Sequence, residues 1–187
     1  MFRCKITTDV KYYNCDFYQS TISELFDEQL EFERLSIELK GSKDEHLLWD
    51  QISSNFGRIE DLRIFSAVNP DFTPVFTSWP QEINIRSSYW FTLEYLLECT
   101  CTKIKLEHSH LGNKDLDVIL NKWKTGGFPT LKCLTIYSQN IKIFGTTILG
   151  MNLRELDGMV IRTYDGSKKA TIRNDFDSIE ICVNLLE

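Results

Sequence analysis

Six short apolar triplets recur along the chain, and they limit the folds that it can adopt. In each triplet an apolar residue is followed three positions later by Leu, Ile or Met, and two positions after that by Leu or Ile. Residues two apart lie on the same face of a β-strand, so each triplet predicts a short strand with one buried face. The middle residues are 21 to 30 positions apart, a spacing typical of leucine-rich-repeat solenoids. The triplets are Phe32/Leu35/Ile37, Ile59/Leu62/Ile64, Pro80/Ile83/Ile85, Cys101/Ile104/Leu106, Leu131/Leu134/Ile136 and Leu156/Met159/Ile161.

The pattern changes after residue 150. Residues 159–164 and 170–173 flank Asp165-Gly166, a dipeptide that favours tight turns, and predict a β-hairpin. A final strand at 178–183 completes an antiparallel end, which covers the core of the last repeat. We therefore expect the α/β class, as a short curved leucine-rich-repeat-like solenoid with a C-terminal antiparallel β cap. One domain, 1–187, is expected. Its parts are strand and helix repeats at 1–57, a repeat core at 58–150 and a hairpin cap at 151–187.

Helical stripes lie between the predicted strands. The clearest helix begins at Asn113, expected as its N-cap, and carries Leu116, Ile119, Leu120 and Trp123 on one face. Strands are expected at 4–7, 32–39, 61–65, 82–86, 103–107 and 131–137. Further helices are expected at 21–30, 44–56 and 91–99. Gly57 is expected to end the helix at 44–56, because glycine often follows the last residue of a helix.

Composition excludes several classes of partner and compartment. A net charge of −6 argues against nucleic acid, whose binding depends on clustered Lys and Arg. No apolar run approaches the roughly 20 residues that a membrane span requires, and the opening residues lack an apolar signal core. The six cysteines are therefore expected as reduced thiols in the cytoplasm or nucleus. Cys101 and Cys133, in or beside repeat strands, are expected to act as small hydrophobes. We expect a monomer.

The middle of the chain carries a distinctive series of motifs. Asn113-Lys114-Asp115-Leu116 begins the clearest helix, Trp123 follows near its end, and Gly126-Gly127 precedes Leu131-Lys132-Cys133-Leu134. Together with the segments 90–97, 104–109 and 111–120, these motifs resemble the type 2 F-box-associated domain. The tail, with Ile161-Arg162, Asp165-Gly166 and Ala170-Thr171-Ile172, also resembles the end of such proteins, so the similarity extends over residues 58–183.

The resemblance implies a role in a cullin-type ubiquitin ligase. Family members place an F-box ahead of this domain; the F-box binds the Skp adaptor, and the associated domain is thought to hold the substrate. An F-box would show a Phe-Pro opening and amphipathic helices, whereas residues 1–31 show neither and the first proline is Pro70. We therefore expect no direct binding of the Skp adaptor by this chain, and at most a competing role.

The resemblance and the strand pattern together predict a surface for an unidentified protein partner. Between the apolar positions of each strand, the intervening side chains face away from the core, on an open sheet face. A mixed-charge surface with aromatic residues can steer and anchor a partner. The residues expected there are Arg34, Asp61, Arg63, Phe65, Asn84, Arg86, Lys103, Lys105, Glu107, Thr135 and Tyr137, beside Ser36, Glu38 and Glu82.

The alternative hypothesis is a metal protein or an enzyme. Cys99 and Cys101, with His108 and His110, could supply four zinc ligands. The two pairs flank one strand, however, so about 10 residues at about 3.3 Å each separate them. We favour core cysteines and surface histidines, without metal or cofactor. No nucleophile motif or phosphate loop occurs either, so we expect a non-catalytic protein.

Overall fold

The chain forms two compact units. In this computed structural model, the structure describes residues 6–10, 24, 31–39, 49–50, 52–66, 74–175 and 177–185. The N-terminal unit is Met1–Trp90 and the C-terminal unit is Phe91–Glu187, so their boundary falls inside the predicted repeat core at 58–150. The helix predicted at 21–30 and most of the one predicted at 44–56 lie outside the described residues.

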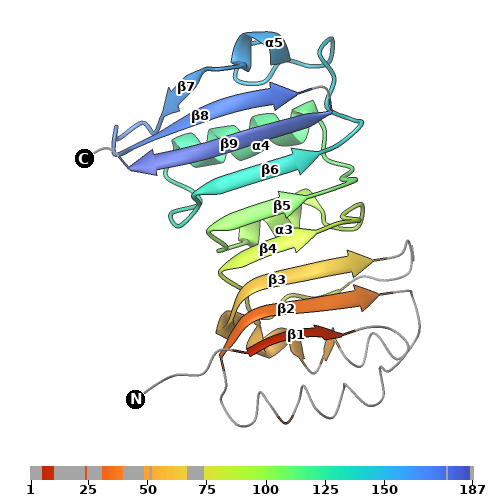
Figure 1. Cartoon of the computed structure of the whole chain (residues 1–187). Helices are drawn as coiled ribbons and strands as arrows, with labels where there is room; N and C mark the ends of the chain where they lie inside the picture. The colour runs from red at the N-terminus through yellow and green to blue at the C-terminus, as the bar shows by residue number, and fades with distance from the viewer. Residues whose placement is uncertain are drawn as a thin grey trace. The chain divides into compact units, whose positions relative to one another are not determined.

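Parallel strands build the described part of the N-terminal unit. β1 (Ile6–Val10), β2 (Phe32–Leu39), β3 (Ile59–Ser66) and β4 (Glu82–Ile85) pair side by side in chain order, all parallel (Figure 1). The register places Leu35, Leu62 and Ile83 opposite one another, and likewise Ile37, Ile64 and Ile85. The first three triplets are thus aligned as equivalent positions of neighbouring strands.

An aromatic cluster packs in the core of this unit. Trp49 is buried, and its ring meets those of Phe56, Phe76 and Trp90 with centroid distances of 5.1, 5.0 and 6.3 Å. The Trp49 indole N–H donates to the carbonyl oxygen of Val75 at 2.8 Å, so its polar atom is satisfied. The prediction that Gly57 ends a helix is wrong, because Gly57 lies inside the 3-10 helix η2 (Ser53–Arg58).

The C-terminal unit combines a parallel and an antiparallel part. β5 (Lys103–Leu106) and β6 (Cys133–Tyr137) pair in parallel, with Ile104 opposite Leu134. β9 (Ser178–Leu185) then pairs antiparallel with β6, β8 (Lys168–Asp175) with β9, and β7 (Val160–Arg162) with β8. The α/β class and the antiparallel end are confirmed, and the solenoid stays a prediction. The last strand is inserted between β6 and β8, which the sequence did not indicate.

The sixth triplet does not form a parallel repeat strand. Leu156 ends the short helix α5 (Leu153–Leu156), and Ile161 lies on β7, which runs antiparallel to β8. These apolar side chains are still buried, because they belong to the core of the antiparallel part. A triplet alone therefore identifies buried positions, but neither the type of element that carries them nor the direction of a strand.

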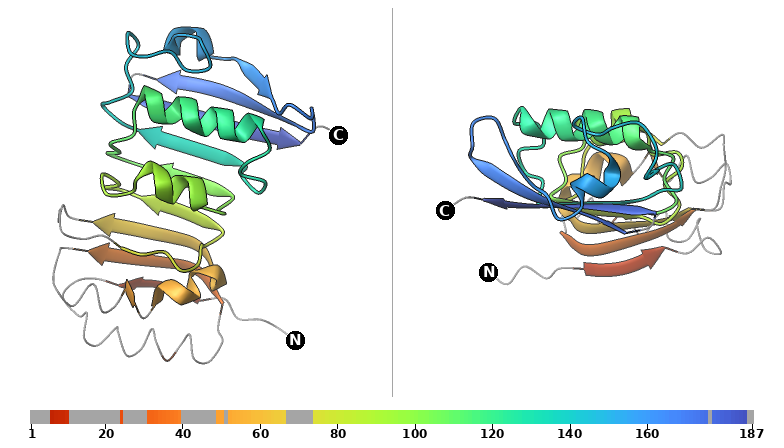
Figure 2. Two further views of the ribbon diagram at one scale, coloured as in Figure 1. Left: turned by 180° about the vertical axis from the view of Figure 1, so that it is seen from behind. Right: turned by 90° about the horizontal axis from the view of Figure 1, so that it is seen from above.

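Two helices cover the C-terminal unit. α3 (Leu93–Glu98) buries Leu96, and α4 (Asn113–Lys124) lies along one face of the strands, where it buries the predicted stripe through Trp123 (Figure 2). The N-cap of α4 is Gly112, so the prediction that Asn113 caps it is wrong. The carboxylate of Asp115 accepts the Gly112 N–H at 2.8 Å instead. Among the described residues no helix has the length and apolarity to cross a bilayer.

The turn between β7 and β8 is held by a carboxylate. Gly166 adopts a φ of 72°, as a tight turn requires, and both carboxylate oxygens of Asp165 accept from the Ser167 hydroxyl at 2.9 Å. Hydrogen bonds from Thr163, then from the backbone and hydroxyl of Ser167, lower the pKa of Asp165 to about 2. The predicted hairpin is confirmed.

This turn provides a prediction that an acid titration can check. The pKa of Asp165 is lowered in the folded chain, so its ionised carboxylate stabilises the fold. This contribution is fully present at a pH above the ordinary pKa of 3.8 and is lost as the pH falls through about 2. We expect a carboxyl NMR titration midpoint near 2 for Asp165, rising toward 3.8 in Ser167→Ala. A midpoint at 3.8 in the unsubstituted chain would contradict this account of the turn.

Candidate protein-interaction surface

The predicted open sheet face exists in both units, and the strand registers place its residues. In the N-terminal unit, Arg34 lies opposite Asp61, and Arg63 lies opposite Asn84. These side chains point away from the buried triplets, because side chains alternate along a strand. A groove of about 550 Å³, here called the N-terminal groove, is lined by Thr7, Asp9, Arg34, Ser36, Glu38, Arg63, Phe65 and Arg86.

One carboxylate holds two guanidinium groups beside the N-terminal groove. Asp61 Oδ2 accepts from Nε of Arg34 at 2.8 Å and from Nε of Arg63 at 2.9 Å. The two Arg side chains are 40% and 38% exposed, while that of Asp61 is 19% exposed. The hydrogen bond to Asp61, and then its charge, raise the pKa of Arg34. Each contact uses one of the five guanidinium N–H donors, so Asp61 orients both groups beside the groove.

An apolar group accompanies this charge cluster. Phe65, two positions after Arg63 on β3, is 38% exposed and lines the N-terminal groove. Arg86 follows β4, and its N–H donates to the Ile64 carbonyl at 2.9 Å, which continues the parallel ladder. The N-terminal groove thus combines an exposed aromatic ring with oriented cations, a combination enriched in protein interfaces.

The predicted residues of the C-terminal unit form a second cluster. Lys105 lies opposite Thr135 on β6; its Nζ is 2.6 Å from Glu107 Oε1 and 5.4 Å from the ring centroid of Tyr137. Lys103, on β5, lies opposite Cys133. A hollow of about 440 Å³, here called the Tyr137 hollow, is lined by Lys105, Glu107, His108, Tyr137, Ser138, Gln139 and Asp177.

Sequence reasoning missed the part of this surface that the cap contributes. Asp177 reaches the Tyr137 hollow because its carbonyl accepts the Ser138 N–H at 2.8 Å, beside the end of β6. A neighbouring hollow of about 500 Å³ is lined by Thr135, Tyr137, Asp157, Gly158, Arg173, Asn174, Asp175, Ser178 and Glu180. No local pattern identifies these residues, since they meet β6 only through the antiparallel pairing of β8 and β9.

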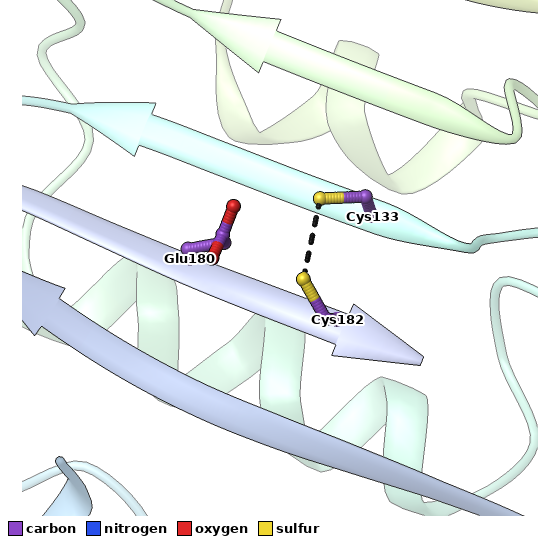
Figure 3. A group of neighbouring side chains, drawn as sticks. All are labelled: Cys133, Glu180 and Cys182. Carbon is purple, nitrogen blue, oxygen red and sulfur yellow. Dashed lines mark hydrogen bonds between the residues drawn. The ribbon is translucent and has the colours of Figure 1, made fainter. Parts of the chain in front are cut away.

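The alternative metal site at Cys99, Cys101, His108 and His110 is not assembled. All four are described, yet they belong to no group of ligand atoms close enough to share an ion. Both cysteines are buried, and the hydrogen bond with Cys99 and then burial raise the pKa of Cys101. Both histidines are exposed. Among the described residues, the close trio of metal-ligand types is instead Cys133, Glu180 and Cys182 (Figure 3).

The fold and this surface define an α/β protein with an open, mixed-charge sheet face. The family model described as F-box associated matches residues 71–136, so this part of the chain is similar to F-box-associated sequences. The match confirms the resemblance seen in the motifs around α4. It covers about a third of the chain, less than the expected 58–183, and leaves out the tail. No curated protein and no solved structure matches the chain.

Proposed function

We propose that this chain is a non-catalytic protein-interaction module of the cytoplasm or nucleus, which resembles the substrate-recognition domain of an F-box protein in a cullin-type ubiquitin ligase but does not itself bind the Skp adaptor. The observation that carries the proposal is the F-box-associated match over residues 71–136. This segment contains Asn84, Arg86, Lys103, Lys105 and Glu107, all on or directly after strands of the open face.

The chemistry of the N-terminal groove favours one kind of partner segment. The paired guanidinium groups of Arg34 and Arg63 suit a carboxylate, which arginine binds through two parallel hydrogen bonds. The exposed ring of Phe65 suits an apolar side chain on the same segment. We therefore propose an extended partner segment that carries acidic residues next to an apolar anchor.

Charge reversal in the N-terminal groove tests this proposal. Arg63→Glu removes one guanidinium and places a second acid beside Asp61, so we expect recovery of the partner to fall about tenfold or more. The measurement is quantitative affinity purification of the tagged chain from cells that express it. Phe65→Ala should cause a similar loss without changing the charge.

Lys114→Glu is the matched control, because Lys114 is exposed on α4 and lies outside the open face. We expect it to leave partner recovery unchanged. Circular dichroism shows whether each variant is folded. If Arg63→Glu fails to fold, Arg63→Gln takes its place. Unchanged recovery with a folded Arg63 variant and with Phe65→Ala would remove the N-terminal groove from the interface.

A further inference from the structure

Two cysteines face each other across the antiparallel strands of the C-terminal unit. Cys133 on β6 lies opposite Cys182 on β9. The adjacent pair is joined by a hydrogen bond from Val183 N to Lys132 O at 2.8 Å. The cysteines therefore occupy a non-hydrogen-bonded position, where opposed side chains come closest. Their Sγ atoms are 3.6 Å apart, and both thiols are free.

A carboxylate completes this group. Glu180 precedes Cys182 by two positions and so lies on the same face of β9. One carboxylate oxygen and both sulfur atoms lie within 4.8 Å of one another (Figure 3). All three side chains are half-buried, so an ion from solvent can reach them. The thiols point to the open face, and Cys133 is half-buried there.

The distance between the two sulfur atoms fits a metal ion in tetrahedral coordination. Zinc–sulfur bonds of about 2.3 Å at a tetrahedral angle place two sulfur atoms about 3.8 Å apart, and zinc–carboxylate bonds are about 2.0–2.2 Å. The observed sulfur separation of 3.6 Å is close to this value. Thiolates select zinc and similar ions over magnesium or calcium. We propose that Cys133, Cys182 and Glu180 bind one zinc-class divalent cation, with a fourth position open to water or a partner's side chain.

The electrostatics of the group favour a cation. Two thiolates and one carboxylate bring three negative charges together, and a bound dication offsets them because it deprotonates the thiols that bind it. Lys103 and Arg173 are the cationic cross-strand neighbours, opposite Cys133 and Glu180. Their two charges are fewer than the three negative charges of the ionised ligands.

Cobalt titration of the reduced chain tests this site directly. In a background with Cys4→Ser and Cys15→Ser, we expect each chain to bind one Co²⁺ and to show thiolate-to-cobalt charge-transfer absorption. Added Zn²⁺ should displace the cobalt, so that this absorption is lost. Cys133→Ser and Cys182→Ser should each abolish the two-thiolate spectrum. Glu180→Gln should weaken binding about tenfold or more while both thiolates remain.

Glu107→Gln is the matched control, since it removes a carboxylate from the open face at the end of β5. We expect its cobalt affinity to equal that of the background chain. Absence of thiolate–cobalt absorption from the folded, reduced chain would overturn the proposal, as would a spectrum that survives both Cys→Ser substitutions. A Cys133–Cys182 disulfide in air, found together with no cobalt binding under reducing conditions, would also overturn it. The outcome is independent of partner binding at the N-terminal groove.

Discussion

Trp123→Ala is expected to lower the free energy of unfolding by about 3–5 kcal/mol, the usual cost of deleting a fully buried large aromatic side chain. Trp123 is 1% exposed and belongs to the buried face of α4, with Leu116, Ile119 and Leu120. Its removal leaves a cavity between this helix and the strands of the C-terminal unit. Urea unfolding followed by far-ultraviolet circular dichroism measures the loss without relying on tryptophan fluorescence.

The same position offers a second, more specific comparison. Trp123 Nε1 is buried and has no hydrogen-bond partner among the described residues. Trp123→Phe removes this unsatisfied donor while keeping most of the aromatic volume, so we expect a loss below about 1.5 kcal/mol. Val118→Ala, on the exposed side of α4, is the matched control and should stay within about 0.5 kcal/mol. Equal effects of Trp123→Ala and Val118→Ala would contradict this packing.

Strand positions were predictable because they depend on a local period. Alternation around Leu35, Leu62 and Ile104 predicts both which side chains are buried and which lie on the open face, and the parallel registers agree. The stripe that ends at Trp123 was predictable for the same reason, with the period of a helix instead. In these elements one local pattern predicts which apolar side chains are buried, although Ser36, on the open face of β2, is buried as well.

The errors arose where a side chain serves a distant part of the chain. Asn113 has the side chain of an N-cap, but it binds backbone about 30 residues downstream, and Gly112 with Asp115 closes the helix instead. Cys133 sits beside a repeat triplet, and only the pairing of β6 with β9 reveals its partner Cys182. The residues of the C-terminal hollows could not be predicted for this reason either, since no local pattern specifies that β9 lies between β6 and β8.

Asn113→Ala is expected to destabilise the chain by about 2–4 kcal/mol, although the side chain it removes is small. Asn113 is 5% exposed; its Nδ2 donates to the carbonyl oxygens of Lys142 at 2.8 Å and Thr146 at 2.9 Å, and its Oδ1 accepts the Lys142 N–H at 2.8 Å. Alanine removes three hydrogen bonds of the buried Asn113 side chain, and each contributes about 0.5–1.5 kcal/mol to stability. Two measurements check this. The midpoint of urea unfolding should fall, and hydrogen exchange at the Lys142 amide should become faster.

Two further variants on α4 test whether the loss of stability comes from the hydrogen bonds of the Asn113 side chain. Asn113→Asp keeps the acceptor for the Lys142 N–H but replaces the donor, so a carboxylate oxygen would face two carbonyls. We expect it to be destabilised despite the favourable position of an acid in the first turn of a helix. Asn121→Ala removes an exposed side chain that, among the described residues, bonds within the helix to the Asp117 carbonyl at 2.9 Å, and it should change stability by less than about 0.5 kcal/mol.

Gly145 provides an independent probe of the same hydrogen bonds. A Cβ added there would lie 2.6 Å from Asn113 Nδ2 and 3.1 Å from the Lys142 carbonyl oxygen. The amide cannot move aside cheaply, because it is buried and held by two carbonyl groups. Gly145→Ala should therefore disrupt the bonds that Asn113→Ala deletes, and the double variant should lose less stability than the two single losses added together. Additive losses would show that Gly145 acts through its own loop rather than through Asn113.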